Sequence, residues 1–196
     1  MGRGMMKRRT ARLWPLLLLL PLLPLAPLAP AAPAAAAARA AGTQDGAGAR
    51  KPYRLEGGEV KVEGAVAFTE GGDRLLPESE KALDALKAYL DDKTAVTTLR
   101  VEAHAGEGGA AAQALSERRA LAVARRLVEK GVDCKRLVAV GFGATKPVAA
   151  GDAPGARAKN SRVAFVNAAL RGRLVGGAPA DGGGRVAGDP CRQGSR

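Results

Sequence analysis

The stretch Leu99–Val123, LRVEAHAGEGGAAAQALSERRALAV, decides how the rest of this chain is interpreted. Its first six residues alternate apolar and polar side chains, which is the period of a half-buried strand. A glycine-rich loop over 105–109 then interrupts the pattern, and from Ala110 the composition favours a helix. Arg119 falls early in that helix, close to the loop. Because backbone N–H groups at a helix N-terminus and a neighbouring guanidinium both attract negative charge, the stretch predicts a site for a carboxylate or phosphate.

The order of these motifs resembles the OmpA-like, peptidoglycan-associated domain. VEAH (101–104) followed by LSERRA (115–120) is similar to that family's V-E-G-H-T-D and L-S-x-x-R-A. GVDCKRLVAVGFG (131–143) matches G-V-x-x-x-R-L-x-x-x-G-x-G, and NSRV (160–163) matches N-R-R-V at all but one position. The resemblance covers about residues 60–167. It implies the family's fold and a role at the bacterial cell wall.

The remaining periodicity predicts an α+β fold. Strands are expected over 60–68, 96–104, 137–140 and 163–166, and helices over 77–90 and 111–130. This order of strand, helix, strand, helix, strand, strand suggests a βαβαββ sandwich. One mixed sheet would have both helices packed on one face, as the resemblance also implies.

Composition divides the chain into four segments. Residues 1–40 have a basic start, an apolar run and an Ala-rich end, which is typical of a secretory signal peptide; the alternative is an uncleaved membrane anchor. Residues 41–58 are expected to form a flexible linker and 59–170 the OmpA-like domain. Residues 171–196 are Gly-rich and aperiodic, and are expected to be disordered.

The net charge of +12 is unevenly distributed. The first 40 residues hold six basic groups and no acidic ones, and without them 25 basic residues face 19 acidic ones. The basicity therefore belongs in part to the signal. With only 3% aromatic residues as well, the sequence argues against a nucleic-acid partner.

The resemblance also identifies candidate ligand-binding residues. In the family, an Asp after H-T and the Arg of L-S-x-x-R-A hold the two ends of diaminopimelate in the stem peptide of peptidoglycan. Arg119 occupies the Arg position, but Gly106 stands where the Asp is expected. Glu107 is the one nearby carboxylate that could replace it. The alternative for Arg119 is a structural ion pair with Glu102 or Glu117.

Three further residues complete the candidate site. Asn160 and Arg162 remain from the N-R-R-V motif, in which Ser161 replaces the first Arg. His104 is the only histidine and has no Cys or His nearby, so neither a metal site nor a general base is expected. We expect it to shape the loop by hydrogen bonding.

The two cysteines, Cys134 and Cys191, leave two alternatives open. In an oxidising compartment they would form a disulfide that pins the tail. Otherwise they are free or intermolecularly reactive thiols.

The sequence thus predicts a non-catalytic envelope protein with no cofactor. Its expected partner is peptidoglycan, bound non-covalently through the diaminopimelate stem peptide, so that the envelope is anchored to the wall of a Gram-negative cell. The expected location is the periplasm, with association with the outer membrane. The alternative is a scaffold of the same fold, whose ligand site has decayed and which contacts outer-membrane or periplasmic proteins.

Overall fold

The computed structural model describes residues 50–178 and 181–192. The predicted signal peptide and the first half of the predicted linker lie outside these residues. Within them, no helix is long and apolar enough to cross a membrane.

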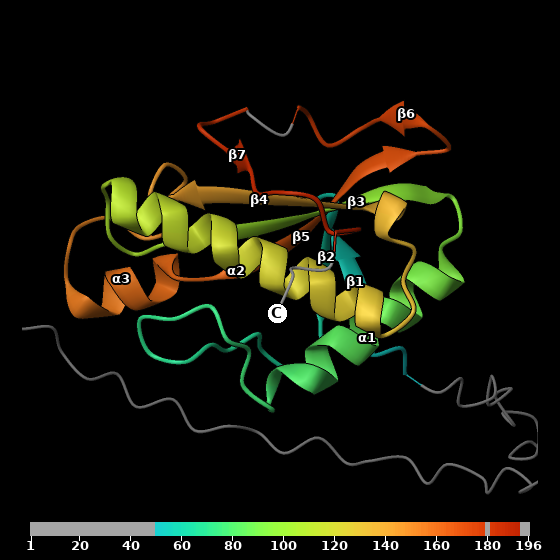
Figure 1. Ribbon diagram of the computed structural model, residues 1–196, viewed down its shortest axis with the longest axis horizontal. Coiled ribbons are helices and arrows are strands. Elements are labelled where there is room, and N and C mark those ends of the chain that lie inside the picture. Colours follow the sequence, from blue (N-terminus) through green and yellow to red (C-terminus); the bar gives the residue numbers. More distant parts are fainter. Residues whose placement is uncertain (1–49, 179–180, 193–196) are drawn as a thin grey trace, which may run out of the picture. The chain divides into compact units, whose positions relative to one another are not determined.

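The chain folds into a mixed sheet with three helices (Figure 1). The elements are β1 (Tyr53–Glu56), β2 (Glu59–Val62), α1 (Ser79–Asp92), β3 (Val96–His104), α2 (Ala110–Glu129), the 3₁₀ turn η1 (Cys134–Arg136), β4 (Leu137–Gly143), α3 (Pro154–Asn160), β5 (Val163–Leu170), β6 (Arg173–Leu174) and β7 (Arg185–Val186). The strand order is β1-β2-β5-β3-β4-β7, with β6 beside β5. Only β3 and β4 are parallel. The predicted α+β fold with one mixed sheet is confirmed.

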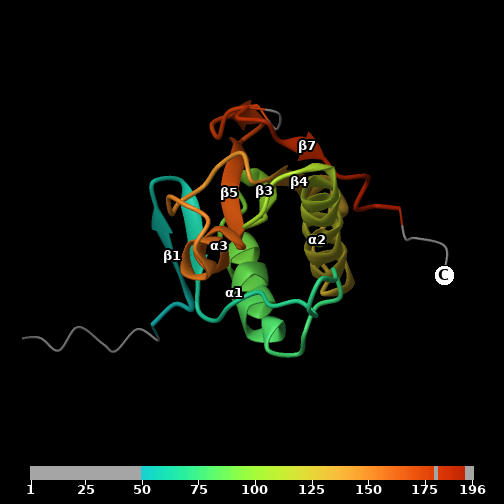
Figure 2. The same ribbon diagram turned by 90° about the vertical axis from the view of Figure 1, so that its left-hand side faces the viewer.

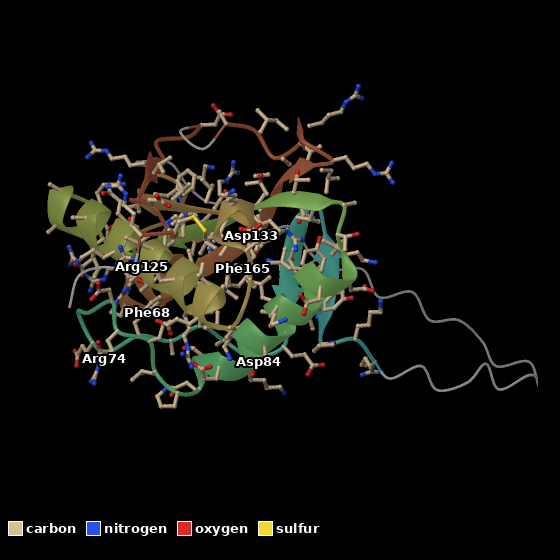
Figure 3. The ribbon with its side chains drawn as sticks, turned by 45° about the vertical axis from the view of Figure 1, so that its right-hand side comes forward. Phe68, Arg74, Asp84, Arg125, Asp133 and Phe165 are labelled. Atoms are coloured by element: carbon tan, nitrogen blue, oxygen red, sulfur yellow. A yellow bond between two sulfur atoms is a disulfide. The ribbon has the colours of Figure 1, made fainter. Side chains whose placement is uncertain are left out.

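Helices α1 and α2 cover one face of the sheet, called here the inner face (Figures 1 and 2). The apolar residues of β3 and the stripes of both helices meet there and are fully buried: Leu83, Leu86, Leu90, Leu99, Val101, Val123 and Leu127. Phe165 of β5 lies in the same interior (Figure 3). Gly141 permits this packing, because a Cβ there would lie 2.4 Å from the backbone nitrogen of Glu117 on α2.

The folded region begins earlier than expected. Residues 53–56, predicted as linker, form β1 and pair with the whole of β2. The Tyr53 ring packs edge-on against Tyr89 of α1, with centroids 5.1 Å apart. An aromatic contact from a distant helix, which no local pattern reveals, therefore orders this segment.

Two elements between the predicted strands and helices also differ. The first strand ends at Val62 rather than 68, and the loop that follows is closed by a single bridge between Phe68 and Leu75. Helix α3 (Pro154–Asn160) was not predicted, because its sequence PGARAKN has no apolar stripe. This short helix proves central to the candidate site.

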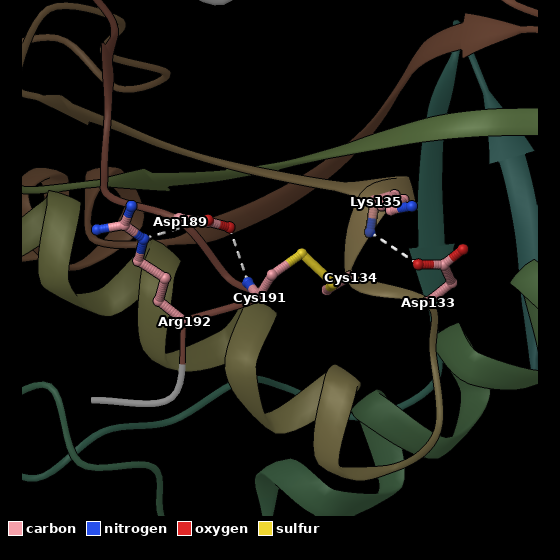
Figure 4. Close-up of a disulfide and its surroundings, with 6 residues drawn as sticks. All are labelled: Asp133, Cys134, Lys135, Asp189, Cys191 and Arg192. Carbon is pink, nitrogen blue, oxygen red and sulfur yellow. Dashed lines mark hydrogen bonds and ion pairs between the residues drawn. A yellow bond between two sulfur atoms is a disulfide. The ribbon is translucent and has the colours of Figure 1, made fainter. Parts of the chain in front are cut away.

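The expectation that residues 171–196 are disordered is wrong for the part that the structure describes. We call residues 173–178 and 181–192 the strap. Its strand β6 pairs with β5, its strand β7 pairs with the edge of β4, and Cys191 forms a disulfide with Cys134 at η1 (Figure 4). Backbone hydrogen bonds and the disulfide order the strap. Because these bonds do not require an apolar side-chain pattern, the composition of the strap did not reveal that it is ordered.

Candidate functional site

A cavity of about 500 Å³ opens where the loop after β3 meets α2, α3 and the loop after β2. Its lining includes three guanidinium groups and one carboxylate: Arg118, Arg119, Arg157 and Glu107. Small residues provide most of the remaining wall: Gly71, Ala105, Gly106, Gly108, Ala111, Ala112, Ala158 and Ser161. We call this cavity the arginine pocket.

Arg119 is held in place from behind. Its Nε donates to the carbonyl oxygen of Gly72 at 2.7 Å, and its guanidinium carbon lies 4.9 Å from the ring centroid of Phe68, a residue of the loop after β2 (Figure 3). Burial lowers the pKa of Arg119, yet a guanidinium stays charged at neutral pH. Among residues 50–178 and 181–192, neither Glu102 nor Glu117 forms an ion pair with it. The structural pairing left open by the sequence is therefore not made, and Arg119 contributes its charge to the arginine pocket.

Gly106, at the position of the family's Asp, is packed against α3. A Cβ at this residue would lie 2.3 Å from the carbonyl oxygen of Arg157 and 2.8 Å from its Cα. The Gly106 amide also donates to Ser161 Oγ at 3.0 Å. The loop at Gly106 thus packs directly on α3 and is hydrogen-bonded to Ser161. The backbone of α3 fills the space that a side chain at position 106 would need.

Glu107 faces Arg157 rather than an empty space. Its Oε1 lies 3.3 Å from Arg157 Nη1, and the two side chains are 72% and 44% exposed. Arg118 lies 3.7 Å from Asp73 in a similar exposed pair. Such exposed pairs contribute about 1 kcal/mol or less and exchange readily with ligands.

The sequence missed Arg157 and Arg118 as site residues. Arg118 is adjacent to the motif arginine and could have been included on spacing alone. Arg157 lies 50 residues from Glu107 and reaches the pocket only through α3. Without that helix, nothing in the sequence places the two together.

The other three predicted residues lie outside the pocket lining. Asn160 is buried, where its Oδ1 accepts from the amides of Val148 and Ala149 at 2.8 and 2.9 Å. Arg162 donates to the carbonyl oxygens of Asn160 and Lys146. Both side chains fasten the segment between β4 and α3, which is a structural role.

His104 points to the opposite face of the sheet from the helices. It is only 2% exposed, and its ring stacks on Phe142 with centroids 5.2 Å apart. Neither ring nitrogen makes a hydrogen bond within the described residues. Stacking on Phe142 thus holds the ring, while the His104 amide donates to the carbonyl oxygen of Arg162 at 2.9 Å.

A charged cluster surrounds His104. Arg100 Nε lies 2.6 Å from Glu102 Oε1, and His104 Nε2 lies 3.5 Å from Glu102 Oε2. Burial by itself would raise the pKa of Glu102, but His104, Arg100 and Lys146 outweigh it and hold that pKa below its ordinary value. Glu102 is therefore ionised at neutral pH and engaged by its neighbours.

Comparison with known proteins identifies the family. The model of the OmpA family matches residues 67–161. The outer-membrane lipoprotein YfiB of Pseudomonas aeruginosa is 36% identical over 119 residues, which span 58% of this chain and 68% of YfiB. The chain belongs to the OmpA family.

Solved structures of OmpA-like proteins resemble it in fold. The cell wall anchor of the T6SS from Pseudomonas aeruginosa has a TM-score of 0.50 and 23% identity, over 60% of this chain and 88% of that one. The peptidoglycan-associated lipoprotein from Burkholderia pseudomallei has a TM-score of 0.45 and 27% identity, over 53% of this chain and 86% of that one. The lining of the arginine pocket includes three of the residues that the motif resemblance singles out, Arg119, Glu107 and Gly106.

Proposed function

We propose that this protein binds peptidoglycan non-covalently through the diaminopimelate-containing stem peptide and anchors the cell envelope to the wall. The family, whose domains are peptidoglycan-associated, supports the class of partner. The arginine pocket supports the mode of binding. The role is a non-catalytic one, in which binding alone supplies the function.

One observation carries the proposal, namely the way in which Arg119 is held by its neighbours. Its Nε donates to the carbonyl oxygen of Gly72, and its guanidinium group packs over the ring of Phe68. The two terminal nitrogens, Nη1 and Nη2, therefore remain available to a ligand. A guanidinium held in this way binds a carboxylate with two parallel hydrogen bonds and little loss of side-chain freedom. Carboxylates are plentiful in the stem peptide.

We place the protein in the periplasm, in contact with the outer membrane. The apolar segment within residues 1–40 supports export, and the relative YfiB is an outer-membrane lipoprotein. The Cys134–Cys191 disulfide is in keeping with an oxidising compartment.

Sedimentation with insoluble peptidoglycan tests the proposal. The full-length protein should pellet with the wall material, and Arg119→Gln should reduce the pelleted fraction several-fold. Arg173→Gln is the matched control, because it removes the same charge from exposed strand β6 and should pellet like the wild type. A wild-type protein that stays in the supernatant would contradict the proposal and favour the scaffold hypothesis.

A further inference from the structure

We propose that the arginine pocket recognises the carboxylate groups of the stem peptide and offers no seat for the ammonium group of diaminopimelate. The inference rests on the proposed function and specifies its ligand chemistry. It departs from the two-ended recognition that the motif resemblance implies. Three features of the pocket carry it.

The first feature is the closed position at Gly106. A carboxylate at this residue would require a Cβ 2.3 Å from a backbone oxygen of α3, closer than any non-bonded contact allows. The hydrogen bond from the Gly106 amide to Ser161 ties the loop to α3 at the same point. A carboxylate side chain therefore has no room at this position, and the carbonyl oxygen of Arg157 that fills the space already accepts from the Ser161 amide at 2.9 Å.

The second feature is the engagement of Glu107. Its carboxylate is the only one that lines the pocket, and it already pairs with Arg157. An incoming ammonium would have to displace a guanidinium and would gain a partner that is 72% exposed to water. Solvent screening makes that exchange nearly neutral.

The third feature is the charge balance. Arg118, Arg119 and Arg157 line the pocket together with Glu107, so the lining carries a net charge of about +2, or about +1 when Asp73, which pairs with Arg118 beside the pocket, is counted. A positive lining attracts a carboxylate and repels an ammonium group. Arg157 comes from α3, whereas Arg118 and Arg119 come from α2, so two different elements supply the positive charge.

Stem tripeptides that differ only in their third residue test the inference, with affinities measured by calorimetry on the full-length protein. One carries diaminopimelate, one carries 2-aminopimelate (carboxylate without the terminal ammonium), and one carries lysine (ammonium without the terminal carboxylate). The aminopimelate peptide should bind within about threefold of the diaminopimelate peptide. The lysine peptide should bind at least about tenfold more weakly, the loss expected for one charge-assisted hydrogen-bonded pair.

Two variants at exposed side chains sharpen the test without threatening the fold. Glu107→Gln should raise the affinity for the diaminopimelate peptide by about threefold, since it removes a competing negative charge and releases Arg157. Arg157→Gln should weaken binding of the diaminopimelate and aminopimelate peptides equally, by about three- to tenfold.

Several outcomes would overturn the inference. They are a tenfold loss with aminopimelate, lysine binding equal to that of diaminopimelate, or a Glu107→Gln defect specific to the ammonium-bearing peptides. Each leaves the proposed function standing, provided that the protein still pellets with peptidoglycan. Absence of both pelleting and peptide binding would instead remove the proposed function, and the inference with it.

Discussion

The two faces of the sheet are both buried, but by different means. The inner face is covered by α1 and α2 through a continuous apolar core, in which Leu86, Leu99 and Leu127 are fully buried. The opposite, outer face carries the buried charged residues Arg100 and Glu102. Apolar packing alone holds α1 and α2 on the inner face. The segment that lies over the outer face has no apolar stripe and must be held by other interactions.

The strap supplies part of that cover. Its residues Gly177 and Ala178 accept hydrogen bonds from Arg100 Nη1 at 3.1 and 3.4 Å. Gly176 lies against the backbone of Asn167 and Ala168 on β5, where no side chain would fit. Figures 1 and 2 both place β6 and β7 on the side of the sheet away from α1 and α2. Polar contacts thus do on this face what hydrophobic packing does on the other. The end of the strap leaves this face, since Ala187 joins the apolar core and Gly188 lies beside Leu121 of α2, and the disulfide ties it there.

The largest expected effect comes from the inner face. Leu127→Ala should lower the free energy of unfolding by about 3–4 kcal/mol, because it leaves a cavity between α2 and the sheet. Denaturant unfolding followed by circular dichroism measures it. Leu174→Ala is the control, since that side chain is 74% exposed and its removal should change little. Equal losses for the two variants would contradict the packing described here.

Removing the disulfide should have the next largest effect. The double variant Cys134→Ser and Cys191→Ser frees a loop of 57 residues and should cost about 2–3 kcal/mol. Hydrogen exchange should show where the loss falls. The Ala187 amide, bonded to the Ala139 carbonyl, should lose protection while the amides of β3 keep theirs. Uniform loss of protection in both would mean that the strap and the core unfold as one unit.

Breaking the charged cluster should cost somewhat less. Glu102→Gln leaves Arg100 buried without its carboxylate, and we expect a loss of about 2 kcal/mol. Exposed Glu56, which pairs with Arg54 at 2.5 Å, gives the matched control, and Glu56→Gln should cost less than about 1 kcal/mol. Thermal unfolding of both variants against the wild type decides the comparison. If Glu102→Gln lowers the stability no more than Glu56→Gln does, the carbonyl oxygens of the strap alone satisfy Arg100.

The smallest effect is the dependence on pH. The pKa of Glu102 lies below its ordinary value of 4.5, and Arg126 and Lys130 lower the pKa of half-buried Glu80 to about 2. A carboxylate whose pKa is depressed by folding stabilises the protein above about pH 4.5 and loses that contribution as the pH falls toward the folded value. The unfolding midpoint should therefore decrease from pH 4.5 to pH 2. The decrease should be shallower in Glu102→Gln, and an unchanged slope there would assign it to surface pairs such as that of Glu80.

Much of the inner face was predictable from local pattern. The expected strand over 96–104 coincides with β3, and the helix expected over 111–130 differs from α2 by one residue at each end. Alternation and helical stripes work here because these residues meet a single large apolar partner surface. On the outer face, Arg100 pairs with Glu102 and also donates to two backbone carbonyls 77 and 78 residues away, and no side-chain pattern encodes the latter contacts.

The candidate site divides in the same way. Arg119 could be found from the motif that surrounds it, because the fold family and the helix position are both local in the sequence. The closed position at Gly106 and the presence of Arg157 were decided by the packing of α3 against the loop after β3, whereas His104 lies outside the pocket because strand alternation turns it to the outer face, where it stacks on Phe142. The sequence by itself determined the family, the sheet with its two long helices and the anchoring arginine, since each is written in local periodicity or motif order. Only the tertiary structure decided the charge of the pocket and the cover of the second face, because both depend on contacts between segments about 50 to 80 residues apart that share no pattern.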